Sequence, residues 1–372
     1  MGLFSKQTDV AVLDIGSGKL SVMIGKKTKD GFIVTVQSEC RYDGFIDGEW
    51  VDEDKLPDRF STVITQAERI YGKKIKELYV GVPGGFTSVN ACEATVTSKF
   101  KKKFDKADVA EILTKANIHK DDARYKAINR SPVYYVVNDQ KKVVDPVGCV
   151  GTKLTGLVSH IYADVRFLNK VTEILNRLGI FKIEFVSSCL AESWFLFDYT
   201  ARDNYVLLVD IGYITTNVML VCGDGLIYLK TFALGSGFLY SDLAQVLDID
   251  YSSAESLKTL LNLNLEFDSD DTYALKNGQT VNAEKANFVV KARLEEIAFY
   301  VSRCISLCPY PVDPETKLYL TGGGIAFLKG GVEYLSYCLN KRVKRAHSNN
   351  PLADKPQYST AYGLVDIALK QL

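Results

Sequence analysis

The sequence contains the same short motif twice, nearly two hundred residues apart. Asp-Ile-Gly stands at Asp14–Gly16 and again at Asp210–Gly212, each time after an apolar run, and each glycine is followed six residues later by Val-Met. Each copy predicts a strand, a tight turn and a second strand. A carboxylate at a strand end can hold a magnesium-bound water, and a nearby glycine lets backbone N–H groups approach phosphate oxygens. One copy alone is most simply a core hairpin with a polar turn, but the matched pair predicts two facing hairpins that grip a nucleotide.

Length and charge limit the class of protein. A chain of 372 residues predicts at least two lobes, each with its own core. Lys and Arg total 45 and so do Asp and Glu, so the neutral chain has no overall attraction to nucleic acid, and we expect no such partner. Eight singly scattered cysteines without a Cys-x-x-Cys pair predict a reduced, cytoplasmic protein. No apolar stretch of about 18 residues predicts a membrane span.

The order of predicted elements indicates an α/β protein with an insertion. Up to Gly84 the spacing of apolar residues predicts the strands and helix of an α/β lobe. After Gly84 the pattern changes to stretches that alternate apolar and polar residues, with a single helix, and these predict a compact, small α+β subdomain. A long helix is expected over 283–308, and a short amphipathic helix over 361–372 is expected to pack on the first lobe. The predicted units are a first lobe over 1–84, 162–202 and 354–372, the inserted subdomain over 85–161, a second lobe over 203–236 and 313–353, and the smaller part of that lobe over 237–312.

Four turns at predicted strand ends form one candidate site. Each turn is rich in glycine or combines glycine with an acid, and they lie at 14–19, 210–216, 235–237 and 321–324. Because ligands of open α/β sheets bind where strand ends converge, these turns predict a single nucleotide site.

These residues resemble the actin/Hsp70/sugar-kinase superfamily of ATP-binding proteins, and within it most closely the FtsA family of actin-like bacterial division proteins. Asp14–Lys19 is similar to the first phosphate turn, Asp210–Thr216 to the second, and Gly322–Gly324 to the adenosine turn. The insertion is more specific. Its stretches Tyr135–Gln140, Asp145-Pro146-Val147-Gly148 and Gly151-x-x-Leu154 resemble those of the FtsA subdomain 1C, also called SHS2.

Two further matches are Ala254–Lys258, which implies that Glu255 and Lys258 contact the nucleoside, and Ala361–Leu364 near the end. The resemblance implies a two-lobed actin-like ATPase fold with an inserted 1C-type subdomain in the first lobe, which binds ATP and Mg²⁺ between the lobes. Asp14 and Asp210 are the candidates for holding Mg²⁺ through water. The candidate binding residues are Asp14, Gly16, Ser17, Gly18, Lys19, Asp210, Gly212, Thr215, Thr216, Gly235, Ser236, Gly237, Glu255, Lys258, Gly322, Gly323 and Gly324.

The resemblance also implies a role in the divisome as a polymerising scaffold or adaptor of the FtsZ ring. FtsZ would bind the smaller part of the second lobe, and the protein would be cytoplasmic, reaching the inner face of the cell membrane through its partners. FtsA proteins typically continue into a membrane-binding helix where this chain stops at Leu372, so we do not expect anchoring by that route. Leu3-Phe4 and the basic run Lys99–Phe104 are alternative membrane contacts, although a frayed terminus and a solvated loop are the simpler interpretations.

The second turn departs from the FtsA pattern. That pattern usually has two further glycines and an aspartate where this chain has Tyr213, Ile214 and Asn217, and the branched Ile214 is expected to crowd the terminal phosphates. Related proteins often have Glu-Pro at the helix start where this chain has Ser188-Cys189, so the carboxylate that polarises water is expected to be absent. We therefore expect nucleotide binding with weak or no ATPase activity, and assign no catalytic residue.

Two other functions fit the same superfamily. One is that of the pilus-assembly relative PilM, which also has an insertion at this place; Asp145-Pro146-x-Gly148 favours FtsA over it. The other is a sugar or carboxylate kinase, for which Asp43 is the one candidate base after the first hairpin.

Overall fold

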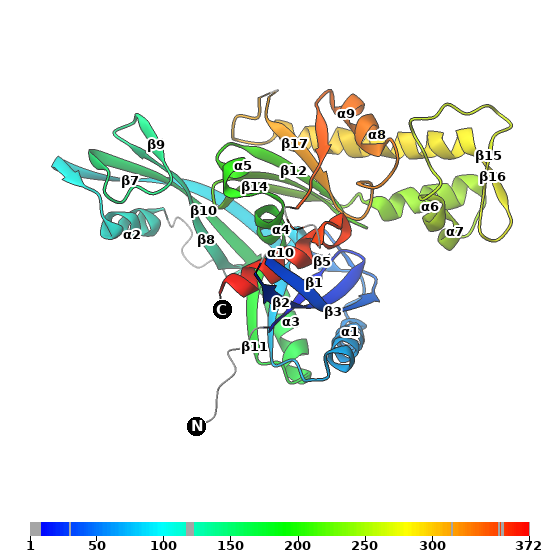
Figure 1. The fold of residues 1–372 in the computed structure, drawn as a ribbon, viewed down its shortest axis with the longest axis horizontal. Coiled ribbons are helices and arrows are strands. Elements are labelled where there is room, and N and C mark those ends of the chain that lie inside the picture. The colour runs from blue at the N-terminus through cyan, green and yellow to red at the C-terminus, as the bar shows by residue number, and fades with distance from the viewer. Residues whose placement is uncertain are drawn as a thin grey trace.

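The computed structural model describes residues 9–29, 31–116, 123–313, 315–348, 350 and 353–371, and within these it has two five-stranded sheets of the same plan (Figure 1). In each sheet the first strand forms an antiparallel hairpin with the second and pairs in parallel with a later strand. One sheet, in the order β11-β6-β1-β2-β3, consists of β1 (Asp9–Ile15), β2 (Lys19–Thr28), β3 (Gly31–Arg41), β6 (Glu77–Val82) and β11 (Lys182–Ser187). The other, in the order β14-β13-β12-β17-β18, consists of β12 (Val206–Ile211), β13 (Thr216–Cys222), β14 (Gly225–Phe232), β17 (Lys317–Thr321) and β18 (Val343–Arg345).

The repeated motif occupies equivalent places in the two sheets. Asp14 is the last residue but one of β1, and Asp210 is the last but one of β12. Both hairpins that the sequence predicts are therefore present, and they belong to separate lobes. The structure has the predicted α/β, two-lobed actin-like fold with a small inserted subdomain.

Helices cover both faces of the first sheet because its strands are apolar on both sides. Leu13 and Ile15 of β1 pack under two helices, whereas Val10 and Val12 pack on the opposite face against two others. The first pair is α1 (Leu56–Tyr71) and α3 (Val165–Arg177), and the second pair is α4 (Ser188–Leu196) and α10 (Ser359–Lys370). The predicted packing of the C-terminal helix on the first lobe is confirmed. A small hairpin, β4 (Phe45–Ile46) with β5 (Glu49–Trp50), and the turns at Gly84–Phe86 and Pro356–Tyr358 complete this lobe.

The second lobe carries the long helix that the sequence predicts. It begins at Ala283, where Asn282 caps it by accepting from the Lys285 amide, and ends at Ser306. This helix is α8 (Ala283–Ser306). The other elements of the lobe are α6 (Ser236–Leu247), α7 (Tyr251–Leu257), α9 (Gly331–Leu339), β15 (Thr272–Ala274) and β16 (Thr280–Asn282), and a short helix, α5 (Tyr199–Arg202), follows a break after α4 and precedes β12. The smaller part of this lobe, formed by α6, α7, β15, β16 and the first half of α8, lies at the right of Figure 1. Ser236 and Gly237, expected in a separate turn, form the start of α6.

The inserted subdomain differs from the compact unit expected. Its strands run in the order β7-β10-β8-β9 and form a long ribbon that projects from the body, with one helix on its side (Figure 1). The expected loop at Lys99–Phe104 is wrong, because Lys99–Lys103 continue β7 and Phe104 is buried under the helix. The elements are β7 (Thr87–Lys103), α2 (Lys106–Lys115), β8 (Tyr125–Val137), β9 (Lys141–Val143) and β10 (Val150–Asp164).

No helix in the described part of the chain is long and apolar enough to cross a membrane. Leu3 and Phe4 lie outside the described residues.

Candidate functional site

A cavity of about 510 Å³ lies between the two lobes, at the ends of β1, β12 and β17. Its volume is that of a typical small-molecule site. All the candidate residues line it except Thr216, Gly235 and Gly237. Thr216 is fully buried, and its hydroxyl donates to the Leu234 carbonyl instead. The structure therefore brings all four predicted turns to one place.

The two repeated turns contact each other directly through Ser17. The Ser17 hydroxyl accepts from the backbone N–H of Ile214 at 3.0 Å and from that of Thr215 at 3.3 Å. These two N–H groups belong to the turn that the resemblance assigns to phosphate. A hydroxyl oxygen of the first lobe thus occupies the donors that a phosphate oxygen would need, and it also joins the lobes.

The side chain of Tyr213, rather than that of Ile214, reduces the space in the cavity beside the second turn. A Cβ placed on Gly18 would lie 2.4 Å from the Tyr213 ring, and the Tyr213 hydroxyl is 2.6 Å from that of Tyr251. The Ile214 side chain points toward Gly44 and is not among the side chains that line the cavity. The expectation that Ile214 crowds the phosphates is therefore wrong, because the turn directs that side chain out of the cavity.

The cavity floor carries carboxyl groups whose charged forms are disfavoured. Burial raises the pKa of Asp14 to about 7, an effect that Lys19 opposes and Asp210 reinforces. Burial also raises the pKa of Asp210 to about 6, against a hydrogen bond from the Asn217 amide at 3.1 Å. Within the described residues no group of three or more His, Cys, Asp or Glu side chains is arranged to hold a metal ion directly.

One wall of the cavity is built on Gly322. Its φ of +95° is a left-handed conformation, and a Cβ there would lie 2.4 Å from both an Asp210 carboxylate oxygen and the Ile211 carbonyl. Lys258 Nζ donates to the Gly323 carbonyl at 2.5 Å. Glu255 forms an ion pair with Arg41 at 2.7 Å, which bridges the lobes. Arg41 was not predicted as a site residue.

Comparison with known proteins decides the family. Residues 207–363 match the family model described as "Cell division protein FtsA", and residues 84–162 match "SHS2 domain inserted in FTSA". A cell division protein FtsA of Bacillus subtilis (strain 168) is 23% identical over 369 residues, covering 96% of this chain and 83% of the relative. The chain belongs to the FtsA family.

Solved structures similar to this FtsA-family chain share its fold. The PilM-PilN type IV pilus biogenesis complex matches with a TM-score of 0.63 and 14% identity, over 97% of this chain and 98% of the other. MreB 5 of Spiroplasma citri bound to AMPPNP matches with a TM-score of 0.58 and 10% identity, over 98% of each chain. At such identities the likeness concerns the fold alone.

Glu192 is a second residue of the cavity in this FtsA-family chain, besides Arg41, that the sequence does not predict. It lies one helical turn after Ser188, on the same face of α4, and its side chain lines the cavity although only 1% of the residue is exposed. The hydroxyls of Ser359 and Thr321 donate to its Oε1, the second at 3.4 Å. Burial, with the neighbouring charge of Asp210, raises the pKa of Glu192 well above its ordinary value. The four-residue spacing from Ser188 was the one signal in the sequence.

Asp43, the candidate base of a kinase, does not join the FtsA-family site. It is exposed, lies 3.6 Å from Lys55 and does not line the cavity. Ser188 and Cys189 begin α4 and line the cavity as expected.

Proposed function

We propose that this FtsA-family division protein binds ATP with Mg²⁺ between its lobes, hydrolyses it weakly or not at all, and serves as a polymerising scaffold or adaptor for the FtsZ ring. The observation that carries the nucleotide proposal is the convergence of four glycine-rich or acid-glycine turns on one cavity between the lobes. We place the protein in the cytoplasm, at the inner face of the cell membrane through its partners.

The residues present fit such a ligand. Gly322, Gly323 and Gly324 line the cavity, and a Cβ on any of them would lie within 3.0 Å of a neighbouring protein atom, so these glycines allow the close packing that shapes the cavity wall. Lys19 and the N-terminus of α6 at Ser236 supply positive potential for the phosphates. When bound, Mg²⁺ neutralises charge on the phosphates, and Asp14 and Asp210 hold its water ligands. Binding of a terminal phosphate to the second turn requires Ser17 to release the two N–H groups that it holds.

Two features support weak hydrolysis. A general base must be ionised, but burial favours the neutral form of Glu192, and its Oε1 is already engaged by Ser359 and Thr321. The donors of the second turn are held by Ser17, so fewer groups are available to stabilise charge on a transferring phosphoryl group.

Nucleotide binding is the first test of this proposal. We expect the purified protein to bind ATP and ADP with micromolar affinity in the presence of Mg²⁺, and Asp210→Ala to weaken magnesium-dependent binding by at least about tenfold, since the substitution removes a carboxylate that holds the hydrated cation. Isothermal titration with each nucleotide, with and without Mg²⁺, measures this. Asp54→Ala, at an exposed carboxylate outside the cavity, is the matched control.

Phosphate release is measured in parallel. The proposal expects release close to the background rate. Absence of any nucleotide binding would contradict the first part of the proposal, and robust magnesium-dependent phosphate release that Asp210→Ala abolishes would contradict the second.

The FtsZ part of the proposal has a candidate surface. In the smaller part of the second lobe, a groove runs beside the first half of α8, lined by apolar Leu265, Phe267 and Phe288 and by Lys285 and Lys291. Phe288 is 71% exposed, an unusual position for a phenylalanine without a partner. FtsZ is the occupant that the family implies. The pilus function has support from the fold alone and is not proposed.

We expect Phe288→Ser to weaken FtsZ binding by about tenfold or more while leaving nucleotide binding unchanged, because the side chain is exposed and its loss removes apolar contact area. Binding is measured by biolayer interferometry with FtsZ in solution. Phe299→Ser is the matched control, as Phe299 is an exposed phenylalanine on the same helix, 60% exposed and outside the groove. Equal loss in both variants would contradict the assignment of the groove.

A further inference from the structure

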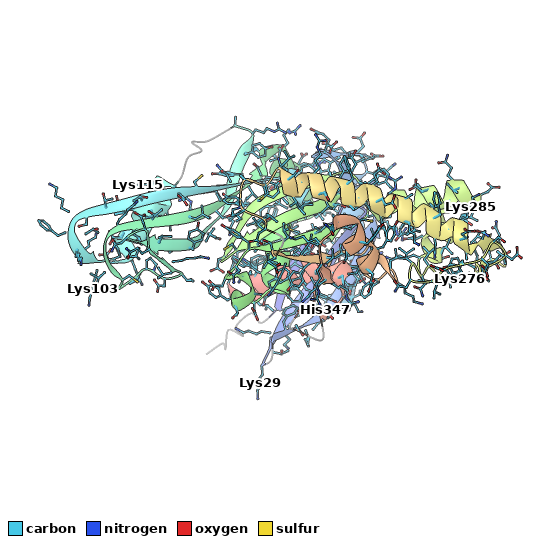
Figure 2. The ribbon with its side chains drawn as sticks, turned by 90° about the horizontal axis from the view of Figure 1, so that it is seen from above. Lys29, Lys103, Lys115, Lys276, Lys285 and His347 are labelled. Atoms are coloured by element: carbon cyan, nitrogen blue, oxygen red, sulfur yellow. The ribbon has the colours of Figure 1, made fainter. Side chains whose placement is uncertain are left out.

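The outer end of the ribbon formed by the inserted subdomain, here called the ribbon tip, consists of residues 98–106 of β7 and the start of α2 with residues 147–151 before and within β10. Backbone pairing holds the two segments together, since Lys103 pairs with Val150 and Phe104 N–H donates to the Cys149 carbonyl at 2.9 Å. Lys103 lies at the far end of the molecule in Figure 2. The ribbon meets the body near Ala91, whose carbonyl accepts from Tyr310. Ala91 pairs with Ser159 and Lys103 pairs with Val150, so nine residues of β10 extend the tip roughly 30 Å beyond that point.

A bulge in β7 pushes part of the tip outward. Lys102 pairs with Gly151 and Thr97 pairs with Lys153, so the four residues Ser98–Lys101 stand opposite the single residue Thr152. Such an excess of residues on one strand bends it away from its partner. Phe100 lies within the bulge and is 81% exposed. A large ring held in solvent by a strand has no structural purpose in the subdomain, whose own core is formed under α2.

The tip combines apolar and basic side chains. Val147 and Val150 are each about half exposed there. Between Ser98 and Lys106 five lysines stand against one aspartate. Lys102 is paired with Asp108 at 2.5 Å, but among the described residues no ion pair involves Lys99, Lys101 or Lys103, and all three are exposed.

We propose that the ribbon tip is a peripheral contact site for an anionic lipid membrane, in which Phe100 enters the interfacial region and Lys99, Lys101 and Lys103 lie against the lipid phosphates. A membrane surface offers hydrocarbon and negative charge in the same plane, which matches a tip that exposes an aromatic ring among lysines. The tip projects at the far end of the molecule (Figure 2), and a soft, flat surface accommodates a projecting tip without a complementary shape. This site is separate from the nucleotide cavity and does not depend on it.

Other polyanions fit the tip less well. A peptide ligand needs a groove or a free sheet edge with pockets for its side chains, and the tip offers a bulged edge. Nucleic acid is usually bound by arginines and several stacking aromatics over an extended basic face, whereas the segment 98–106 contains no arginine and its second phenylalanine, Phe104, is buried.

The test is vesicle binding by the full chain. Sucrose-loaded vesicles of phosphatidylcholine alone, or with about 30% phosphatidylglycerol, are sedimented with the protein in about 0.1 M salt. We expect binding to the anionic vesicles only. Replacing Lys99, Lys101 and Lys103 together by Gln should lower the partition coefficient by about a hundredfold, and Phe100→Ser should lower it by about tenfold.

A matched control changes the same charge elsewhere. Lys29 and Lys276 lie away from the tip (Figure 2), and Lys344 lies in β18 of the second lobe; the three are replaced together by Gln. We expect this control to bind as the unmodified chain does, and circular dichroism to show all variants folded, because every altered side chain is exposed. The proposal is overturned if the unmodified chain ignores anionic vesicles, if either tip variant binds normally, or if the control loses as much as the tip. Binding of an acidic peptide or an oligonucleotide at the tip, without vesicle binding, would assign the surface to that partner instead.

Discussion

Asp14→Asn is expected to stabilise the metal-free and nucleotide-free protein at pH 8 by about 4 kcal/mol, and the gain is expected to vanish near pH 4. Asp14 is almost wholly buried, and burial raises its pKa from the usual 3.8 to about 7. Each pKa unit corresponds to about 1.4 kcal/mol of difference between the protonated and ionised forms. Asparagine has nearly the same shape and never ionises, so it lacks this cost.

The sign follows from proton binding. Below pH 4 the carboxyl group is protonated in both the folded and the unfolded chain, so it contributes no difference. Between pH 4 and 7 the unfolded chain releases this proton whereas the folded protein retains it, and the free energy of unfolding falls as the pH rises. Above pH 7 the folded protein carries the full cost of a buried charge. Asp210, whose pKa burial raises to about 6, adds a cost of the same sign.

Urea unfolding between pH 4 and 8 with a chelator present measures the effect. The control is Asp54→Asn at an exposed carboxylate, for which we expect a change within about 0.5 kcal/mol at every pH. Two results would contradict this prediction: a difference in the free energy of unfolding between Asp14→Asn and the unmodified chain that is the same at every pH, or a less stable variant at pH 8. Either result would show that the folded protein ionises Asp14 without cost. If the proposed cation site is correct, the variant that gains stability also loses magnesium-dependent nucleotide binding, as expected where a site retains a costly charge for function.

The sequence predicts the features that are local or repeated. Asp14 and Asp210 indicate two strand-turn-strand units because each unit is formed by residues adjacent in the chain. The repeat further predicts equivalent sheets, and the two sheets have the same strand order. Gly322 is predictable for a related reason. A glycine directly after a strand indicates that other atoms come close to the backbone there, and in the structure atoms of Asp210 and Ile211 lie close to Gly322.

The sequence does not predict contacts that depend on how the lobes meet. Ser17 was assigned to phosphate, but its hydroxyl accepts from two N–H groups that lie about two hundred residues further along the chain. Arg41 and Glu255 are similarly distant, and neither carries a sequence pattern that indicates the other. Glu192 enters the site because Thr321 and Ser359 converge on it from two other elements. These contacts are set by tertiary packing, and the local secondary-structure propensity of each segment carries no information about them.

The ribbon fails local prediction for a different reason. Only four residues of β7, Ala94–Thr97, alternate clearly enough to indicate a strand, whereas the strand has 17 residues. Thr87–Glu93 and Lys102–Lys103 are held by pairing with β10, which satisfies the backbone at both ends of the bulge. Long-range pairing therefore overrides the composition of Lys102 and Lys103.

Gly363→Ala is expected to destabilise the protein by about 3 kcal/mol, although alanine in a helix interior is normally favoured over glycine by about 1 kcal/mol. Gly363 lies in α10 where that helix crosses α4. A Cβ there would lie 2.2 Å from the Ala191 carbonyl oxygen and 2.9 Å from the Glu192 nitrogen. Both are backbone atoms, which cannot rotate away as a side chain can, so the two helices would have to separate.

The separation would affect more than one contact. α10 is buried along most of its length, and its first residue, Ser359, donates to Glu192 at the cavity floor. We therefore expect Gly363→Ala to weaken nucleotide binding as well as stability, if the cavity binds nucleotide as proposed. Guanidinium unfolding monitored by tryptophan fluorescence gives the stability, and Trp194 on α4 reports on the crossing itself.

Gly72→Ala separates the effect of packing from that of backbone conformation. Gly72 ends α1 with φ of +74°, and nothing lies within 4 Å of a Cβ placed there. Its replacement strains the backbone alone and is expected to cost about 1 kcal/mol. Gly363 has an ordinary helical backbone, so its replacement tests packing alone. We therefore expect Gly363→Ala to lower the free energy of unfolding clearly more than Gly72→Ala does. The opposite rank, or a gain in stability at Gly363, would mean that α4 and α10 do not meet backbone to backbone and that Ser359 is not held against Glu192 by this crossing.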